Sequence, residues 1–410
     1  MARRNERSGC MGCMGCATLL ALIAAIVVAL ALHYAPPVIR NVAVAYSRRL
    51  SDTLGIAKKD QVTQAEGTSA DGMAIGYSGK LLSESQQAVY TQMLNEAAAF
   101  SQSFAVFEAS PEDIDPAYKA VIRDHPELFW LDGSCRYTYS KIGDVVSVEL
   151  GLNMELENVP AMKSRIEAVA DELMLDVPAD ASAYEVAKAA YEKIIATTDY
   201  DVNASQNQNI QSVFLGKSSV CAGYARAYQY LLQRRGVPCA YVEGKITTTG
   251  EDHAWNLVQI GDAFAYVDVT WGDPTYSGET SDVPLDSIIY DYFCLTTAEI
   301  TRDGHAFANP EVWPVCDSPE LDYYHTSGLF YETYDESQIN FSFLAQTQEH
   351  PGSAYFKFAN DEAYLTASIA LSEGTFARDQ LLQIAMGSGN DSIVYKYATS
   401  DTLRILKVYW

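Results

Sequence analysis

The chain has 410 residues, which is too long for one ordinary domain and fits two or three. Hydrophobic residues make up 48% and charged residues 20%, a composition that excludes a disordered protein. The formal net charge is −25, and it is unevenly distributed: residues 1–60 hold eight basic and three acidic residues, so the remainder holds 20 basic and 50 acidic ones. A body this acidic repels phosphate groups, so we expect no nucleic acid partner.

The N-terminus has the plan of an export signal. Three arginines among the first seven residues precede an uncharged apolar run over 17–32, an arrangement that keeps the basic end in the cytoplasm. We expect residues 1–35 to be a cytoplasmic stub and a signal anchor, with one pass through the cell membrane and the body outside the cytoplasm. Cleavage at Ala29-Leu30-Ala31 would instead make the protein secreted. Either way the body is exported, and the membrane is a partner only through this segment.

The chain has eight cysteines, of which three precede the apolar run and five follow it. Cys10, Cys13 and Cys16 precede the apolar run and have no fourth ligand nearby, so we expect juxtamembrane cysteines rather than a metal site. The exported body holds the other five, which are Cys135, Cys221, Cys239, Cys294 and Cys316. An odd number permits two disulfides at most and leaves one free thiol, and the sequence does not choose the pairing.

The first part of the body is predicted to be a linker followed by a small α+β unit. Residues 36–79 are a juxtamembrane segment and linker, rich in Gly, Ser and Ala towards their end. Residues 80–155 form the N-terminal unit. Within it we expect helices over 81–100 and from Asp115-Pro116 onward, and strands over 104–107, 135–140 and 145–153.

Residues 156–318 are predicted to be the principal domain. We expect helices over 159–175, 183–197 and 220–235, followed by strands over 239–243, 254–260 and 263–269. Because Gly261-Asp262 marks a tight turn, the last two strands should pair antiparallel. A helix followed by an antiparallel meander indicates an α+β fold rather than a parallel sheet.

Residues 319–410 are predicted to form a C-terminal α+β or β-rich unit. Alternating apolar and polar residues predict strands over 329–334, 339–344, 355–358, 393–397 and 403–408, with a helix over 377–386. No motif in this unit indicates a function.

Three short stretches of the principal domain carry residues suited to nucleophilic catalysis. They are Ser218-Ser219-Val220-Cys221-Ala222-Gly223-Tyr224-Ala225, Asp252-His253-Ala254-Trp255-Asn256 and Tyr266-Val267-Asp268-Val269-Thr270-Trp271-Gly272-Asp273-Pro274. A cysteine in the first turn of a helix favours the thiolate, because unpaired N–H groups and the positive end of the helix dipole lie there. If the two strands pair through the turn, His253 and Asp268 lie at the same edge, where the carboxylate orients the imidazole towards the thiol.

In order and spacing these stretches resemble the transglutaminase-like superfamily, over about residues 182–300. The resemblance implies a core in which a cysteine-bearing helix packs on an antiparallel sheet, flanked here by smaller α+β units. It also implies a catalytic triad of Cys221, His253 and Asp268. No cluster of His, Cys and Asp stands outside these residues in the sequence, so we expect no metal and no cofactor.

The donor that would complete an oxyanion hole is less clearly marked. The N–H of Cys221 supplies one donor. Related sites use a side chain from the loop before the nucleophile, and Gln206, Gln208 and Gln211 all lie in that loop. Gln211 is our prediction, and Tyr200 and Ser212 are its rivals.

The function expected from this resemblance is thiol-dependent acyl transfer on a peptide or protein substrate. Cys221 would form a thioester, which water hydrolyses and an amine converts to a cross-link. By resemblance to bacterial members we expect an extracytoplasmic hydrolase of peptide or amide bonds in surface or cell-wall substrates. The alternatives are a protein-glutamine cross-linking transglutaminase and a non-catalytic module that binds peptides. The sequence does not choose between hydrolysis and cross-linking, and the intact triad argues against a module that only binds.

Overall fold

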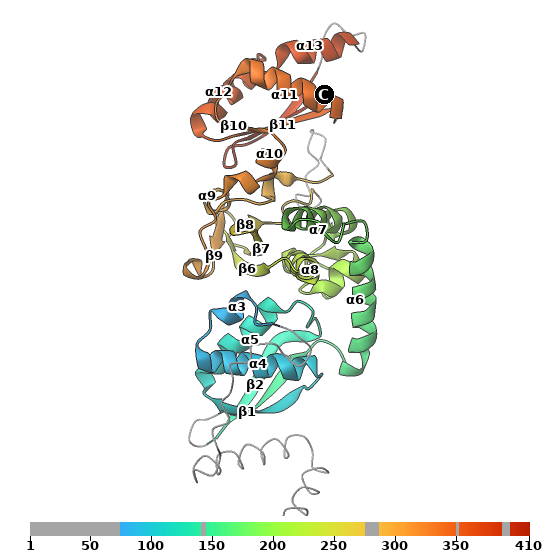
Figure 1. Cartoon of the computed structure of the whole chain (residues 1–410), viewed down its shortest axis with the longest axis vertical. Helices are drawn as coiled ribbons and strands as arrows, with labels where there is room; N and C mark the ends of the chain where they lie inside the picture. Colours follow the sequence, from blue (N-terminus) through green and yellow to red (C-terminus); the bar gives the residue numbers. More distant parts are fainter. Residues whose placement is uncertain (1–73, 141–144, 275–286, 350–351, 388–393) are drawn as a thin grey trace, which may run out of the picture. The chain divides into compact units, whose positions relative to one another are not determined.

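The computed structural model shows an α+β protein. It describes residues 74–140, 145–274, 287–349, 352–387 and 394–410. Helices and small sheets alternate along these ranges (Figure 1). The predicted apolar run over 17–32 lies outside them, and among the residues that the structure describes no helix is long and apolar enough to cross a bilayer.

The chain divides into two compact units. The first includes Leu82–Ile122 and Trp130–Met154, and the second consists of Gly76–Leu81, Arg123–Phe129 and Glu155–Trp410. The second unit therefore holds all three sequence stretches with nucleophile, base and carboxylate.

The first unit is a three-stranded antiparallel sheet with two helices. Its elements are α4 (Glu84–Ala98), β1 (Ser103–Ala109), α5 (Pro111–Asp124), β2 (Leu131–Tyr139) and β3 (Val145–Leu152), and the strand order is β1-β3-β2. The helix predicted from Asp115-Pro116 begins earlier, at Pro111. The carboxylate of Asp113 accepts hydrogen bonds from the backbone N–H and the hydroxyl of Ser110, and proline suits the first helical position.

The sheet at the centre of the second unit has four antiparallel strands in the order β8-β7-β6-β9. The strands are β6 (Cys239–Ile246), β7 (Asp252–Ile260), β8 (Ala263–Val267) and β9 (His305–Phe307). Ile260 pairs with Ala263 across the turn, which confirms the predicted pairing, and Gly261 supplies the positive φ of 63° that the turn needs.

Two helices pack beside this sheet. These helices are α7 (Ala183–Thr197) and α8 (Cys221–Arg234), and α8 contacts both β6 and β7. The remaining elements of this region are α3 (Tyr77–Lys80), α6 (Val159–Leu173), β4 (Asp199–Tyr200), β5 (Ser218–Ser219), α9 (Thr297–Arg302) and α10 (Tyr323–Thr326). The core is therefore the predicted arrangement of a cysteine-bearing helix on an antiparallel sheet.

The C-terminal part of the second unit is a mixed sheet covered by helices. Its elements are β10 (Phe330–Tyr331), α11 (Glu336–Glu349), β11 (Ser353–Phe358), α12 (Asp361–Ser372), α13 (Arg378–Gly387), β12 (Lys396–Ser400) and β13 (Ile405–Tyr409), with the strand order β10-β11-β13-β12. The strand predicted over 339–344 was wrong, because these residues lie in α11. Ile339 and Phe343 are buried and Phe341 is exposed, which is the helical spacing of i and i+4.

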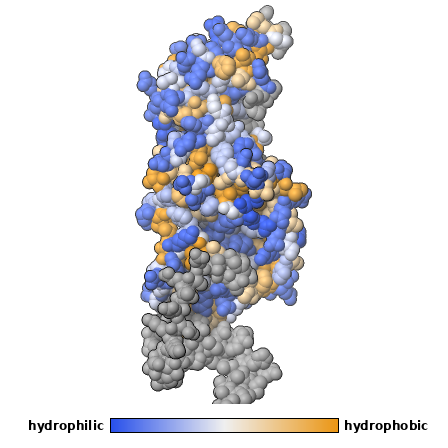
Figure 2. Space-filling model, viewed as in Figure 1, coloured by the Kyte–Doolittle hydropathy of each residue, from blue (hydrophilic) through white to orange (hydrophobic). Residues whose placement is uncertain are grey.

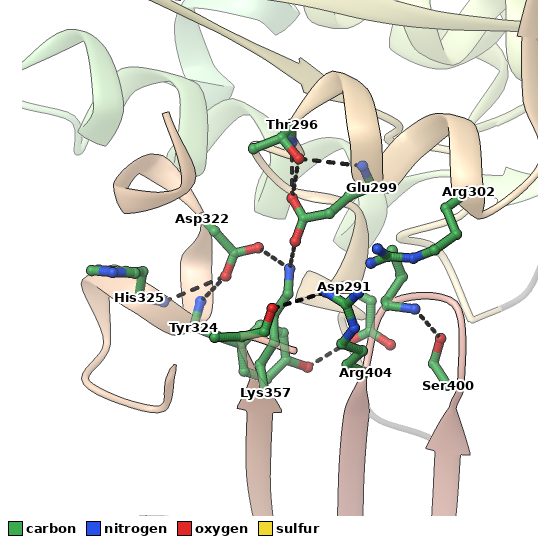
Figure 3. A network of polar contacts seen from close by, with 12 residues as sticks. Asp291, Thr296, Glu299, Arg302, Asp322, Tyr324, His325, Lys357, Ser400 and Arg404 are labelled. Carbon is green, nitrogen blue, oxygen red and sulfur yellow. Dashed lines mark hydrogen bonds and ion pairs between the residues drawn. The ribbon is translucent and has the colours of Figure 1, made fainter. Parts of the chain in front are cut away.

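A buried ion network joins the C-terminal sheet to α9 and α10. The Nζ of Lys357, on β11, lies 2.6 Å from Asp322 and 2.7 Å from Glu299 (Figure 3). On β13, the Nζ of Lys407 lies 2.9 Å from Asp291, which also accepts a hydrogen bond from the Tyr324 hydroxyl. Buried lysines are rare unless they are paired, and each of these has a carboxylate partner.

The surface in Figure 2 is mostly hydrophilic, with apolar residues scattered among the polar ones. This pattern agrees with the large excess of acidic residues in the body of the chain. Scattered apolar residues are normal on soluble proteins.

Candidate active site

The nucleophile candidate is the first residue of a helix. Cys221 begins α8, and its N-cap residue Val220 makes no side-chain cap. The N–H groups of Gly223 and Tyr224 donate to the Val220 carbonyl. Those of Cys221 and Ala222 have no backbone acceptor within the described ranges, so both are free to bind an anion.

The loop before the nucleophile lies tightly against the first turn of α8. Parallel pairing of β4 with β5 places Ser219 beside this turn, and the Ser219 hydroxyl lies 2.7 Å from that of Ser212. A Cβ on Gly223 would overlap Ser219 Oγ, would lie 2.8 Å from Ser212 Oγ and 2.9 Å from the carbonyl oxygen of Asn207. Glycine is therefore needed two residues after Cys221, because only a bare backbone admits this approach.

Two polar side chains fix the sheet and the following loop to α8. The amide of Asn256, on β7, donates to the carbonyl of Ala225 at 2.9 Å. The hydroxyl of Tyr224 lies 2.6 Å from the carboxylate of the buried Asp273. These contacts account for the Asn and Tyr beside the nucleophile and base, since both hold the helix in register with the strands that carry His253 and Asp268.

His253 and Asp268 meet at one end of the sheet. His253 is the second residue of β7, and Asp268 directly follows β8. The Nε2 of His253 donates to Oδ2 of Asp268 at 2.6 Å, and both side chains are buried. The other ring nitrogen is not used by Asp268, and His253 and Cys221 line the same cleft, where the charge of Cys221 contributes to the raised pKa of His253. The predicted proximity of the two residues is confirmed, and the catalytic roles of all three remain predictions.

The carboxylate of Asp268 is fully supplied with donors. Its Oδ1 accepts the N–H groups of Thr270 and Trp271 at 2.9 and 3.1 Å. Burial alone would raise the pKa of Asp268, but the charge and hydrogen bond of His253 outweigh it and hold that pKa well below its usual range. Burial alone would lower the pKa of His253, but the charge of Asp268 reverses this and raises it to about 10. The Asp268 carboxylate therefore favours the protonated form of His253.

His305 is a residue that the sequence did not connect to the site. Its Nε2 lies 3.0 Å from Oδ2 of Asp268, and the residue is fully buried. His305 begins β9, 37 positions after Asp268 along the chain. No motif near it in the sequence indicates this contact.

An open cleft of about 910 Å³ exposes the nucleophile. Its lining consists of Tyr200, Gln208, Val220, Cys221, Ala222, Tyr241, Glu243, Gly244, Lys245, Asp252, His253, Ala254, Ala306, Phe307 and Ala308. Cys221 is half-buried, so it can meet a substrate. A cleft that combines apolar walls with a few polar groups is the usual form of a ligand site.

The candidates for the second oxyanion donor occupy different places. Gln208 and Tyr200 line the cleft, whereas Gln211 and Ser212 are not part of its lining. Gln211 is buried, and its Nε2 has no hydrogen-bond partner in the described part of the chain. The role of Gln211 thus remains a prediction, and Gln208 and Tyr200 are the ones in contact with the cleft.

The His253, Asp268 and His305 side chains are also close enough to form a metal-binding group, with their ligand atoms within 4.8 Å of one another. Zinc ligands at about 2.0–2.2 Å in a tetrahedral site lie more than about 3 Å apart. The 2.6 Å between His253 and Asp268 is instead a hydrogen-bond distance. We therefore interpret the three residues as a hydrogen-bonded set.

The other four cysteines of the described body have environments that differ from that of Cys221. All five are free thiols, so none of the disulfides that the sequence allowed is formed among them. Burial raises the pKa of Cys239 and Cys294 far above the usual value, and it raises that of Cys135 and Cys316 to about 11. These four thiols are therefore poor nucleophiles at neutral pH.

Residues 168–270 match the family model of the transglutaminase-like superfamily, and this segment contains Cys221, His253 and Asp268. Over 226 residues the chain is 25% identical to the kyphoscoliosis peptidase of Mus musculus, covering 50% of this chain and 32% of that protein. The Homo sapiens kyphoscoliosis peptidase is 24% identical over 225 residues, covering 50% and 31%. The chain thus spans about a third of the length of these curated relatives. A crystal structure of a TGase is similar at 14% identity over 38% of this chain and 46% of that chain, with a TM-score of 0.26.

Proposed function

We propose that the transglutaminase-like domain at residues 168–270 is a cysteine-dependent acyl-transfer enzyme that hydrolyses peptide or amide bonds. The observation that carries the proposal is the meeting of Cys221 and His253 at one cleft, with the buried Asp268 hydrogen-bonded to His253. Cys221 and His253 both line the cleft, and Asp268 is hydrogen-bonded to His253 at 2.6 Å. This is the nucleophile, base and orienting carboxylate of a thiol protease.

The first half of the reaction forms an acyl-enzyme. The Cys221 thiolate attacks the carbonyl carbon of the substrate, and an S–C bond forms while the carbonyl oxygen takes up the negative charge. The free N–H groups of Cys221 and Ala222 are donors for that oxyanion. The C–N bond then breaks, and the His253 imidazolium gives its proton to the departing amine.

The second half regenerates the thiolate. Neutral His253 takes a proton from a water molecule, whose oxygen attacks the thioester carbon. The S–C bond breaks, the acid leaves, and the thiolate and imidazolium pair is restored. If an amine replaces water in this step, the product is an amide and the reaction is a cross-link.

Hydrolysis is the outcome we propose, because the matched curated relatives are named as peptidases. We also propose that the substrates are peptides outside the cytoplasm, cell-wall peptides among them. The support for this location is the basic start and apolar run of the N-terminal 35 residues.

The test incubates the full chain with a mixture of peptides, with and without a lysine-containing amine donor, and analyses the products by mass spectrometry. We expect cleaved peptides in both mixtures, none with Cys221→Ala, and unchanged cleavage with Cys135→Ala as the matched control. Amide-linked products that form only with the donor would establish cross-linking instead. No turnover together with a Cys221 that alkylates like an ordinary thiol would indicate a non-catalytic binding module.

A further inference from the structure

Asp268 is shared by two buried histidines, and only one of them reaches the cleft. His253 and His305 both place Nε2 near the same oxygen, Oδ2, at 2.6 and 3.0 Å. His253 lines the cleft and His305 does not. His305 therefore has no contact with the space where a substrate would bind, and its polar contact is with the carboxylate.

Asp268 and His305, which are hydrogen-bonded to each other, come from opposite edges of the sheet. Asp268 follows β8 at one edge, and His305 begins β9 at the other. Strands about 4.8 Å apart would separate the edges of a flat four-stranded sheet by about 14 Å. Side chains from both edges meet at 3.0 Å only if the sheet curls at this end. The hydrogen bond of His305 thus joins the two edges of the curled sheet behind His253.

The proton of His305 is best placed on Nε2. With that tautomer Nε2 donates to Asp268, and Nδ1 is left with a lone pair that has no partner in the described residues. The opposite choice, or a cation, would leave an N–H group buried without an acceptor, which is the more costly arrangement. A neutral donor supports the Asp268 carboxylate without competing with the charge of His253.

Aromatic side chains packed against His305 leave its ring little room to rotate. The ring lies edge-on to Trp255 and Trp271, with centroid distances of 5.0 and 4.5 Å, and 5.5 Å from the ring of His253. The charged groups near it are Asp268, His253 and, through a longer-range interaction, Asp303. Packing on this scale fixes the ring, so the donor to Asp268 is preorganised.

We infer that His305 is a positioning residue, which holds the Asp268 carboxylate in the orientation that keeps His253 directed at Cys221. The inference rests on the proposed function. With the donor removed, Oδ2 can rotate away from the ring of His253 and their interaction weakens. Less imidazolium then stands beside Cys221, and the thiol should be less reactive at low pH.

The test measures the rate of Cys221 alkylation by iodoacetamide against pH in the full chain, with peptide mapping to identify the labelled cysteine. His305→Phe keeps a flat ring and removes the donor. We expect its rate at pH 6 to fall about tenfold, the effect of a one-unit shift in the profile. His305→Gln restores an N–H donor and should stay within about threefold of the wild type. His125→Phe removes another buried histidine that contacts a carboxylate, that of Glu127, and is the matched control.

The outcomes separate the inference from the function it rests on. An alkylation profile of His305→Phe that matches that of the wild type overturns the inference and leaves the triad intact. A wild-type Cys221 that is unreactive at pH 6 overturns the proposed function itself. If His305→Phe does not fold, the ring ¹⁵N resonances of the wild type decide instead. A proton on Nε2 of His305 that is protected from exchange supports the inference, and a proton on Nδ1 overturns it.

Discussion

Lys357 should be the residue whose loss most weakens the attachment of the C-terminal sheet. Its side chain is 1% exposed and lies between Asp322, which is equally buried, and Glu299 (Figure 3). Burial alone would lower the pKa of Lys357, but the two carboxylates outweigh it and raise that pKa, so the lysine is charged at neutral pH. Lys357→Met keeps the volume and the apolar stem and removes the charge.

The expected loss of stability follows from the burial of the carboxylates. Removing one partner of a buried ion pair costs about 3–5 kcal/mol, because the remaining charges have neither solvent nor a counterion. That is roughly a 150- to 4,000-fold change in the folded-to-unfolded ratio. Lys245→Met is the matched control: its pair with Asp252 is exposed, with side chains 59% and 90% accessible, and its loss should have little effect.

The loss should also depend on pH in a definite direction. Burial alone would raise the pKa of Glu299, but Lys357 outweighs it and lowers that pKa, so this contribution exists above the unfolded value of about 4.3 and is lost as pH falls below it. Burial raises the pKa of Asp322, so this residue protonates readily once the lysine is gone. The difference between the wild type and Lys357→Met should therefore shrink towards pH 4.

The assay is guanidinium unfolding at pH 7 and pH 4, with hydrogen exchange in β11 and β13 to locate the effect, because a chain of two units need not unfold in one step. A loss at pH 7 no larger than that of Lys245→Met would refute the reasoning. So would a loss that grows at pH 4.

Three further predictions concern the site. Gly223→Ala should destabilise the fold by about 1–3 kcal/mol and lower the alkylation rate of Cys221, because a Cβ there overlaps Ser219. In the control, Gly216→Ala, the added Cβ meets only one atom, at 3.9 Å, and should be tolerated. Equal thermal midpoints for the two variants would contradict this prediction. Peptide hydrolysis should fall as pH rises through about 10, because Asp268 raises the pKa of His253 to that value and the leaving amine needs a proton from the imidazolium. A pH–rate profile with its midpoint near 7 would show that Asp268 does not keep His253 protonated. Dialysis against EDTA should leave hydrolysis and alkylation unchanged if the His253, Asp268 and His305 set is hydrogen-bonded, and loss of both that zinc restores would establish a metal site.

The parts of the site that the sequence predicted are those with local signals. A cysteine after a serine-rich turn, a histidine in a strand and an aspartate at the end of the next strand are linked by one tight turn. Because the turn at Gly261 sets the register, the proximity of His253 to Asp268 follows from local pairing. His305 could not be found in this way, because its contact depends on how far the sheet curls.

The strand wrongly predicted over 339–344 comes from an apolar pattern that fits both a strand and a helix. Ile339, Phe341 and Phe343 alternate with polar residues as a strand would, but Ile339 and Phe343 also stand at i and i+4. The deciding signal is Asp335, whose carboxylate accepts the N–H of Gln338 and caps α11. Ser110 and Asp113 give the same kind of signal at the start of α5. Capping residues thus separate helix from strand where the apolar pattern does not.

The central claim is that Cys221 is an activated nucleophile because His253 stands beside it, and its most direct test is the iodoacetamide rate against pH for the full-length wild type and His253→Ala. We expect Cys221 in the wild type to react readily at pH 6. In His253→Ala it should react like an ordinary thiol, only above about pH 8. Unchanged low-pH reactivity in His253→Ala would contradict the account, since the thiolate would then owe its stability to the start of α8 alone.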